Sequence, residues 1–180
     1  MRTLRILSSV LLSLTSSTLN AEDADTVPVE LEVLKGSIGV WDAEGEVWAQ
    51  GLDKESIKFT SVETNTAFGH HWLASDLVSN FGGQSMALHS IVGYDLEKKK
   101  LVGTVIDQGP YAAKLTGEYD EETKTTTWIT DAKDAAGKPI EQKTTVTQES
   151  ADERVLVLHV PGAKEGEWVK FMEMRFVRRK

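Results

Sequence analysis

Apolar and polar residues alternate along most of the chain after Gly36. Within residues 56–64, for example, Ile57 and Phe59 alternate with Lys58 and Thr60. A period of two places successive side chains on opposite faces of an extended strand, so the pattern predicts β-structure. Ten segments show this alternation or the β-branched and aromatic content of strands: 39–50, 56–64, 71–79, 85–94, 100–107, 112–119, 124–130, 140–147, 154–160 and 167–178.

The connections between these segments are short and mostly polar. Residues 83–107 carry two strand-like runs around the charged turn 96–100, which is a hairpin signal. No connection after Gly36 could hold the crossover of a parallel βαβ unit, which needs about a dozen residues or more. We therefore expect antiparallel neighbours, with strands far above the usual ~20–25% of residues. Closure removes the edges of such a sheet, so the predicted fold is an all-β, antiparallel, up-and-down barrel of about ten strands.

A short segment before the first strand has the signals of a helix. Residues 28–35 begin with Pro28 and are followed by Gly36, the asymmetry expected at the two ends of a helix. The apolar residues between them also allow a strand. As a helix, the segment could cover one end of the barrel.

Residues 1–21 have the pattern of a secretory signal peptide. Arg2 and Arg5 form a basic start, residues 6–14 are largely apolar, and small residues lead to Ala21. The apolar run is too short for the ~30 Å hydrocarbon core of a bilayer, which argues against a membrane anchor. We therefore expect an exported chain, periplasmic or secreted, with one domain over 22–180 and no stable membrane insertion after cleavage.

Charge and cysteine content narrow the function. The 180 residues carry a net charge of −8, and removal of Arg2 and Arg5 leaves 18 basic against 28 acidic residues. An acidic surface repels nucleic acid, so we expect no nucleic-acid partner. The chain has no cysteine, which excludes thiol nucleophiles, thiolate metal sites and disulfides. The hydrophobic core alone must therefore stabilise the fold, and a chain of this length can form such a core.

Two sets of motifs resemble known families. Gly39-Val40-Trp41 resembles the Gly-x-Trp that opens lipocalin-type (calycin) barrels. That resemblance implies that Trp41 closes one end of the barrel, with Arg175, Arg178 or Arg179 of the last strand packed over it beside Phe176.

The second set spans nearly all of the chain after residue 30. Gly93-Tyr94-Asp95, the run 101–107, the turn after Tyr119 and the closing run 172–179 are similar to an uncharacterised bacterial family, domain of unknown function 1579, whose members are often secreted. The resemblance covers residues 31–179 and implies a lipocalin-like barrel, but no activity.

The four histidines give no metal signature. No His-x-His or His-Glu-x-x-His spacing links His70, His71, His89 and His159, so we expect no metal. Small calycin barrels that bind haem through a late-strand histidine raise a haem interpretation for His159. Leu156 and Leu158 alternate opposite it, however, so His159 faces solvent if they fill the core. We expect no cofactor.

The aromatic residues suggest a ligand cavity inside the barrel. Ten strands enclose more volume than eight, and a small apolar or amphipathic ligand would fit there. We expect such a ligand to contact five residues: Trp41, Trp72, His89, Tyr94 and Arg175. His89 alternates with Ser85, Ala87 and Ile91, so it could face the cavity, although a hydrogen-bonded structural histidine is the simpler interpretation.

Two other functions remain open at this point. One is an envelope structural or interaction module whose core is solid. The other is an enzyme using His89 and the carboxylates Asp76, Asp107 and Glu173, which the sequence places within strand patterns. An ion pair between Glu173 and Arg175 is the simpler use of that carboxylate. No nucleophile elbow or phosphate loop is present, so we name no catalytic residue and favour binding over catalysis.

Overall fold

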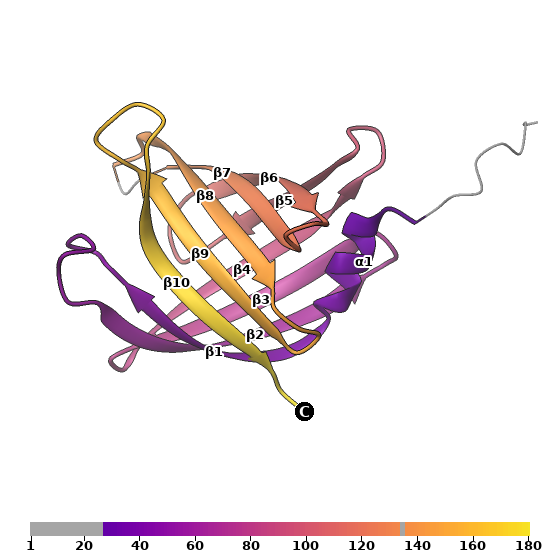
Figure 1. Cartoon of the computed structure of the whole chain (residues 1–180), viewed down its shortest axis with the longest axis horizontal. Coiled ribbons are helices and arrows are strands. Elements are labelled where there is room, and N and C mark those ends of the chain that lie inside the picture. The colour runs from indigo at the N-terminus through magenta and orange to yellow at the C-terminus, as the bar shows by residue number, and fades with distance from the viewer. Residues whose placement is uncertain (1–26, 134–135) are drawn as a thin grey trace, which may run out of the picture.

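The computed structural model describes residues 27–133 and 136–180, which form one helix and ten strands (Figure 1). The segment predicted as a signal peptide lies outside the described residues. The elements are α1 (Val29–Gly36), β1 (Gly39–Val47), β2 (Ile57–Phe68), β3 (Trp72–Phe81), β4 (Gln84–Asp95), β5 (Lys100–Ile106), β6 (Ala112–Asp120), β7 (Thr125–Lys133), β8 (Pro139–Gln148), β9 (Glu153–Pro161) and β10 (Trp168–Arg178).

The strands form a closed antiparallel barrel in chain order. Each strand pairs with its neighbours in sequence, and β10 returns to pair with β1, from Trp41 opposite Arg178 to Val47 opposite Met172. The predicted lipocalin-like barrel of about ten strands is therefore confirmed. A register shift between Lys170 and Met172 marks a bulge in β10.

The helix expected at residues 28–35 is also present. Pro28 precedes its first residue, and its carbonyl accepts the Leu31 N–H at 2.9 Å. α1 lies at one end of the barrel and contacts β3 and β4 (Figure 1). Its apolar side buries Leu31 and Leu34, so the helix covers that end. Among the described residues, no helix is long and apolar enough to cross a membrane.

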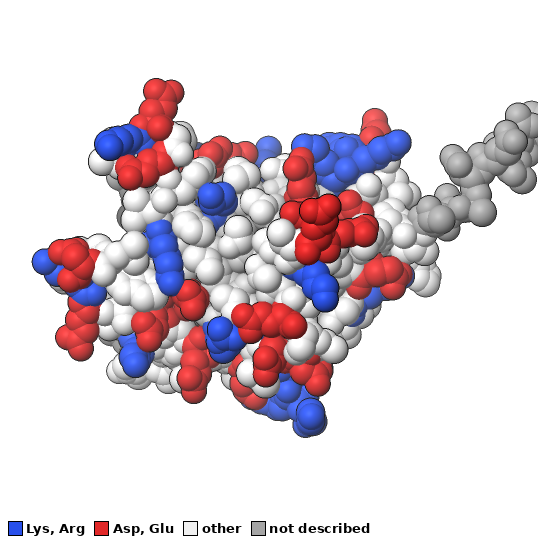
Figure 2. Space-filling view, viewed as in Figure 1, with Lys and Arg blue, Asp and Glu red and all other residues white. Residues whose placement is uncertain are grey.

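Two apolar clusters occupy the interior of the barrel. The first joins β1, β2 and β10 through Trp41, Ala43, Phe59, Met174 and Phe176. The second, with Leu34, Leu73, Val92 and Leu101, lies beneath the helix. The wall that faces the viewer in Figure 2 carries acidic and basic side chains interspersed among uncharged ones. The alternation along the strands thus separates an apolar inside from a charged outside.

Candidate functional site

The inward-facing side chains leave a cavity inside the barrel with a volume of ≈ 300 Å³. Its wall is mostly apolar and draws on strands all around the barrel. Representative apolar residues are Leu77, Leu88, Val105, Leu156, Leu158 and Met172. A concave, mostly apolar space with a few polar groups is the usual form of a small-molecule site, so the cavity is the candidate site.

One part of the cavity wall is polar and charged. Glu63 of β2 forms an ion pair with Arg154 of β9, and only 17% and 8% of the two side chains are exposed. Glu63 Oε2, the oxygen that faces Arg154, also accepts a hydrogen bond from Asn65 Nδ2 at 3.1 Å. The other oxygen, Oε1, accepts the Ser75 hydroxyl at 3.1 Å. We call Glu63, Asn65, Ser75 and Arg154 the polar cluster. All four residues line the cavity.

Arg154 is held between aromatic rings. Its guanidinium carbon lies 4.3 Å from the centre of the Trp41 ring and 4.8 Å from that of Phe176, the geometry of cation–π contacts. Burial, followed by the positive charge of Arg178, lowers the pKa of Arg154 to about 10. Arg154 therefore stays charged at neutral pH and keeps a cation inside the barrel.

The arginine expected to pack over Trp41 is Arg178. Its guanidinium carbon lies 4.1 Å from the ring centre, while its side chain donates to the Ile38 carbonyl at 2.5 Å and to the Asp152 carboxylate at 3.1 Å. Arg179, another of the three candidates, follows the last strand and pairs with Asp42. The contact of a second arginine, Arg154, with this ring was not predicted.

Two of the five predicted ligand-binding residues lie inside the barrel. Trp41 is fully buried, and its indole N–H donates to the Ser37 carbonyl at 2.9 Å. Tyr94 packs against the cluster under the helix, where burial and then the charge of Glu30 raise its pKa. Neither is part of the wall of the cavity itself. Trp41 instead packs against Arg154, and Arg154 lines the cavity.

The other three predicted residues lie on the outer surface. Trp72 packs over Gly93, where an added Cβ would collide with the indole ring. His89 bonds through Nδ1 to the Asp76 carboxylate at 2.7 Å, with 40% of its side chain exposed. Its neighbours Leu88 and Ser90 line the cavity, so His89 does not face it. The hydrogen-bonded structural histidine is the arrangement that the structure shows.

Arg175 also points outward, because Met174 and Phe176 on either side of it are buried in the core. It pairs with Glu149, and Glu173 pairs with Lys170, so the ion pair expected between Glu173 and Arg175 is absent. Glu173 and Arg175 both follow the bulge in β10 and keep the two-residue spacing of one strand face, but each pairs with a different residue.

The other candidates for chemistry are dispersed. His159 lies between Lys143 and Lys170 of the adjacent strands, and burial, with the charges of these lysines, lowers its pKa. Asp107 follows β5 in a turn, where it accepts the Gly109 N–H at 2.7 Å, so its predicted place within a strand was wrong. Within residues 27–133 and 136–180, no three His, Asp or Glu side chains gather as a metal site would require.

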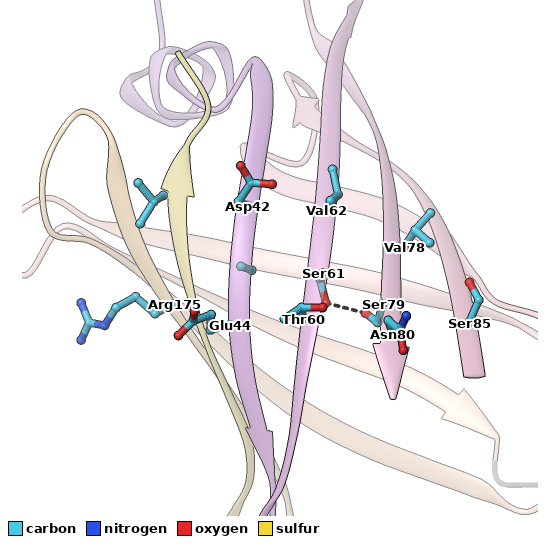
Figure 3. A pocket seen from close by; sticks show the side chains of 12 residues that line it. Asp42, Glu44, Thr60, Ser61, Val62, Val78, Ser79, Asn80, Ser85 and Arg175 are labelled. Atoms are coloured by element: carbon cyan, nitrogen blue, oxygen red, sulfur yellow. Dashed lines mark hydrogen bonds between the residues drawn. The ribbon is translucent and has the colours of Figure 1, made fainter. Parts of the chain in front are cut away.

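A second hollow lies on the outside of the barrel, across β10, β1, β2 and β3 (Figure 3). It has a volume of ≈ 600 Å³ and exposes Glu44, Thr60, Val62, Asn80 and Arg175. The inward Ser61 and Ser79 bond to each other at 2.7 Å beneath it. This hollow lies on the outer surface and its lining includes Glu44 and Arg175, whereas the inner cavity has a mostly apolar wall, so the inner cavity is the better candidate.

Comparison with known proteins places this geometry in context. The family model described as "Protein of unknown function (DUF1579)" matches residues 29–178. No curated protein matches the sequence.

Two solved structures share the fold. One is Rv2717c from M. tuberculosis, with a TM-score of 0.62 and 10% identity over 83% of this chain and 97% of that one. The other is the S-type phycobiliprotein lyase CPES from Guillardia theta, with a TM-score of 0.56 and 11% identity over 84% of this chain and 93% of that one. At such low identity, these likenesses show the fold alone.

Proposed function

The chain belongs to the family described as protein of unknown function (DUF1579), whose description names no activity, and we propose that it binds a small apolar or amphipathic ligand inside the barrel. The observation that carries this proposal is the cavity of ≈ 300 Å³ with its apolar wall and polar cluster. A space of this size holds about ten groups as large as a water molecule, each occupying ~30 Å³. A ligand of roughly ten non-hydrogen atoms would fill it.

The apolar wall supplies the affinity in this proposal. Transfer of apolar ligand surface from water to such a wall is worth about 25 cal/mol per Å². The polar cluster orients an amphipathic ligand, because it places Glu63 and Arg154 in a mostly apolar wall, in which Lys124 is the other charged residue. The presence of a lyase among barrels of this shape is compatible with the proposal and does not identify a ligand.

The cavity favours ligand binding over the two alternatives. A structural module with a solid core would fill this space with its own side chains. An enzyme built on His89 and lumenal carboxylates would need His89 inside the barrel, and His89 lies outside. We therefore propose binding without catalysis.

Neighbouring threonines of β8 provide the test. Thr144 lines the cavity, and Thr145 points to the opposite face of the strand. We expect Thr144→Trp to weaken binding of the neutral fluorophore 1-aminonaphthalene, whose size matches the cavity, more than about tenfold, because the indole occupies the space that the ligand needs. Fluorescence titration measures the affinity.

Thr145→Trp is the matched control, with the same substitution on the outer face. We expect its affinity for the fluorophore to stay within about twofold of the parent protein. Binding that is absent from the parent protein, or equal in the two variants, would refute a lumenal site.

We also propose that the chain is exported and that residues 1–21 are removed. The basic start, short apolar run and small residues before Glu22 support this. Expressed in full in a Gram-negative host, the protein should appear in the periplasmic fraction, with an intact mass that begins after Ala21. Retention in the cytoplasm at full mass would contradict the proposal, and a cytoplasmic marker protein controls the fractionation.

A further inference from the structure

We propose that the ligand ends in a neutral group that both donates and accepts hydrogen bonds, an alcohol hydroxyl being the simplest, and that this group binds between Asn65 and Arg154. The inference rests on the proposed lumenal binding and specifies the ligand class. Its basis is the pairing of donors and acceptors within the polar cluster.

Asn65 contributes an acceptor that meets no donor. It is 2% exposed, and its Nδ2 donates to the Ser37 carbonyl and to Glu63 Oε2, both at 3.1 Å. Both partners are acceptors, so they fix the amide with its nitrogen towards them. Asn65 Oδ1 is then left without a hydrogen-bond partner among the described residues. A buried carbonyl without a donor is costly, so a ligand that supplies one is favoured.

Arg154 contributes donors beside that acceptor. Its Nη2 donates to the same Glu63 oxygen that Asn65 Nδ2 contacts, which brings the two side chains together. It has no other acceptor in the part of the chain that the structure describes. The Trp41 and Phe176 rings lie over the guanidinium, which leaves its N–H edge for a ligand oxygen. Since a guanidinium carries five N–H donors, an acceptor on the ligand is also favoured.

Charge argues for a neutral group. A ligand carboxylate would lie beside Glu63, whose charge is already compensated by Arg154, and it has no hydrogen to give Asn65 Oδ1. An ammonium group would lie beside Arg154 and could not accept from it. A hydroxyl adds no charge, accepts from Arg154 and donates to Asn65, so it matches both groups.

The rest of the ligand follows from the wall of the cavity. Leu88, Leu158 and Met172 offer only apolar surface, which suits an alkyl chain. With about ten non-hydrogen atoms in the space available, decan-1-ol is a suitable probe. The proposal therefore names a medium-chain alcohol or a similar hydroxyl-ended amphiphile.

Two isomeric ligands test the effect of the hydrogen-bond donor while the size and the acceptor of the ligand stay the same. Decan-1-ol and 1-methoxynonane have the same atoms, and both oxygens accept, but only the alcohol donates. In competition with 1-aminonaphthalene, we expect decan-1-ol to bind about tenfold more tightly than the ether, because only the alcohol satisfies Asn65 Oδ1. Decanoate should bind more weakly than the alcohol at neutral pH.

Variants locate the preference at Asn65. We expect Asn65→Leu to remove the difference between alcohol and ether, since no acceptor remains. Gln142→Leu, at a polar residue of β8 that also lines the cavity, should keep it. If Asn65→Leu does not fold, as circular dichroism would show, the isomer comparison on the parent protein still decides.

The remaining outcomes oppose the proposal. Equal affinity for the two isomers, tighter binding of the ether or decanoate, or an alcohol preference that survives Asn65→Leu would each overturn it. If the fluorophore and every probe fail to bind, lumenal binding itself fails. If they bind without discrimination, only the hydroxyl preference fails.

Discussion

Replacement of Trp41 by alanine should destabilise the protein by about 4 kcal/mol, the middle of the range for a buried tryptophan. The Trp41 side chain is fully buried, and Arg154 and Arg178 both lie over its ring, at 4.3 Å and 4.1 Å from the ring centre. The substitution removes apolar contacts, two cation–π contacts and the bond to the Ser37 carbonyl. Urea unfolding followed by circular dichroism measures the loss.

Trp72→Ala is the control, because this ring lies on the outside of the barrel with 39% of the residue exposed. Because the ring packs over Gly93 on the outer surface, we expect a loss typical of a surface residue, about 1 kcal/mol or less. Equal losses in the two variants would contradict the view that the buried Trp41 ring stabilises the barrel more than an exposed ring does. A domain of ordinary stability, about 5–15 kcal/mol, would retain a measurable transition in both variants.

The closed barrel could be predicted because its causes are local. Alternation within each segment, short polar connections and the lack of long crossovers left antiparallel neighbours as the consistent arrangement. Trp41 could be placed inside because Gly39-Val40-Trp41 resembles the Gly-x-Trp on the first strand of lipocalin-type barrels. Pro28 and Gly36 likewise marked the two ends of the helix, although the apolar residues between them also allowed a strand.

The orientation of β4 was misjudged although its pattern carried a signal. The row with His89 has Ala87 and Ile91 as its apolar members, whereas the row with Leu88 also holds Met86, Val92 and Tyr94. The second row is the more hydrophobic one, and it is the row that faces the core. The outward position of His89 follows from the register that pairs it with Asp76, and this register is a property of the assembled sheet.

The polar cluster was missed for a different reason. Glu63 and Arg154 are 91 residues apart, and no local pattern joins two such charges inside a core. A signal was nevertheless present in β9, where Arg154 shares the period-two row of Leu156 and Leu158. That row faces the cavity, so an arginine in it had to be buried and paired.

Loss of Arg154 alone should be nearly as damaging as loss of Trp41. We expect Arg154→Met to cost about 3–5 kcal/mol, because it leaves the Glu63 carboxylate buried without its positive partner. Methionine keeps much of the apolar contact with Trp41 and Phe176, so the loss reports chiefly on charge. Urea unfolding at neutral pH gives the value.

The double variant Arg154→Met with Glu63→Gln separates the charge from the packing. Glutamine keeps a side-chain oxygen for Ser75 or Asn65 and removes the unpaired negative charge. We expect the double variant to recover at least about 1 kcal/mol relative to Arg154→Met, because a neutral pair avoids the cost of an isolated buried ion. A double variant no more stable than the single one would show that Arg154 stabilises the barrel through its contacts with the two rings and not through Glu63.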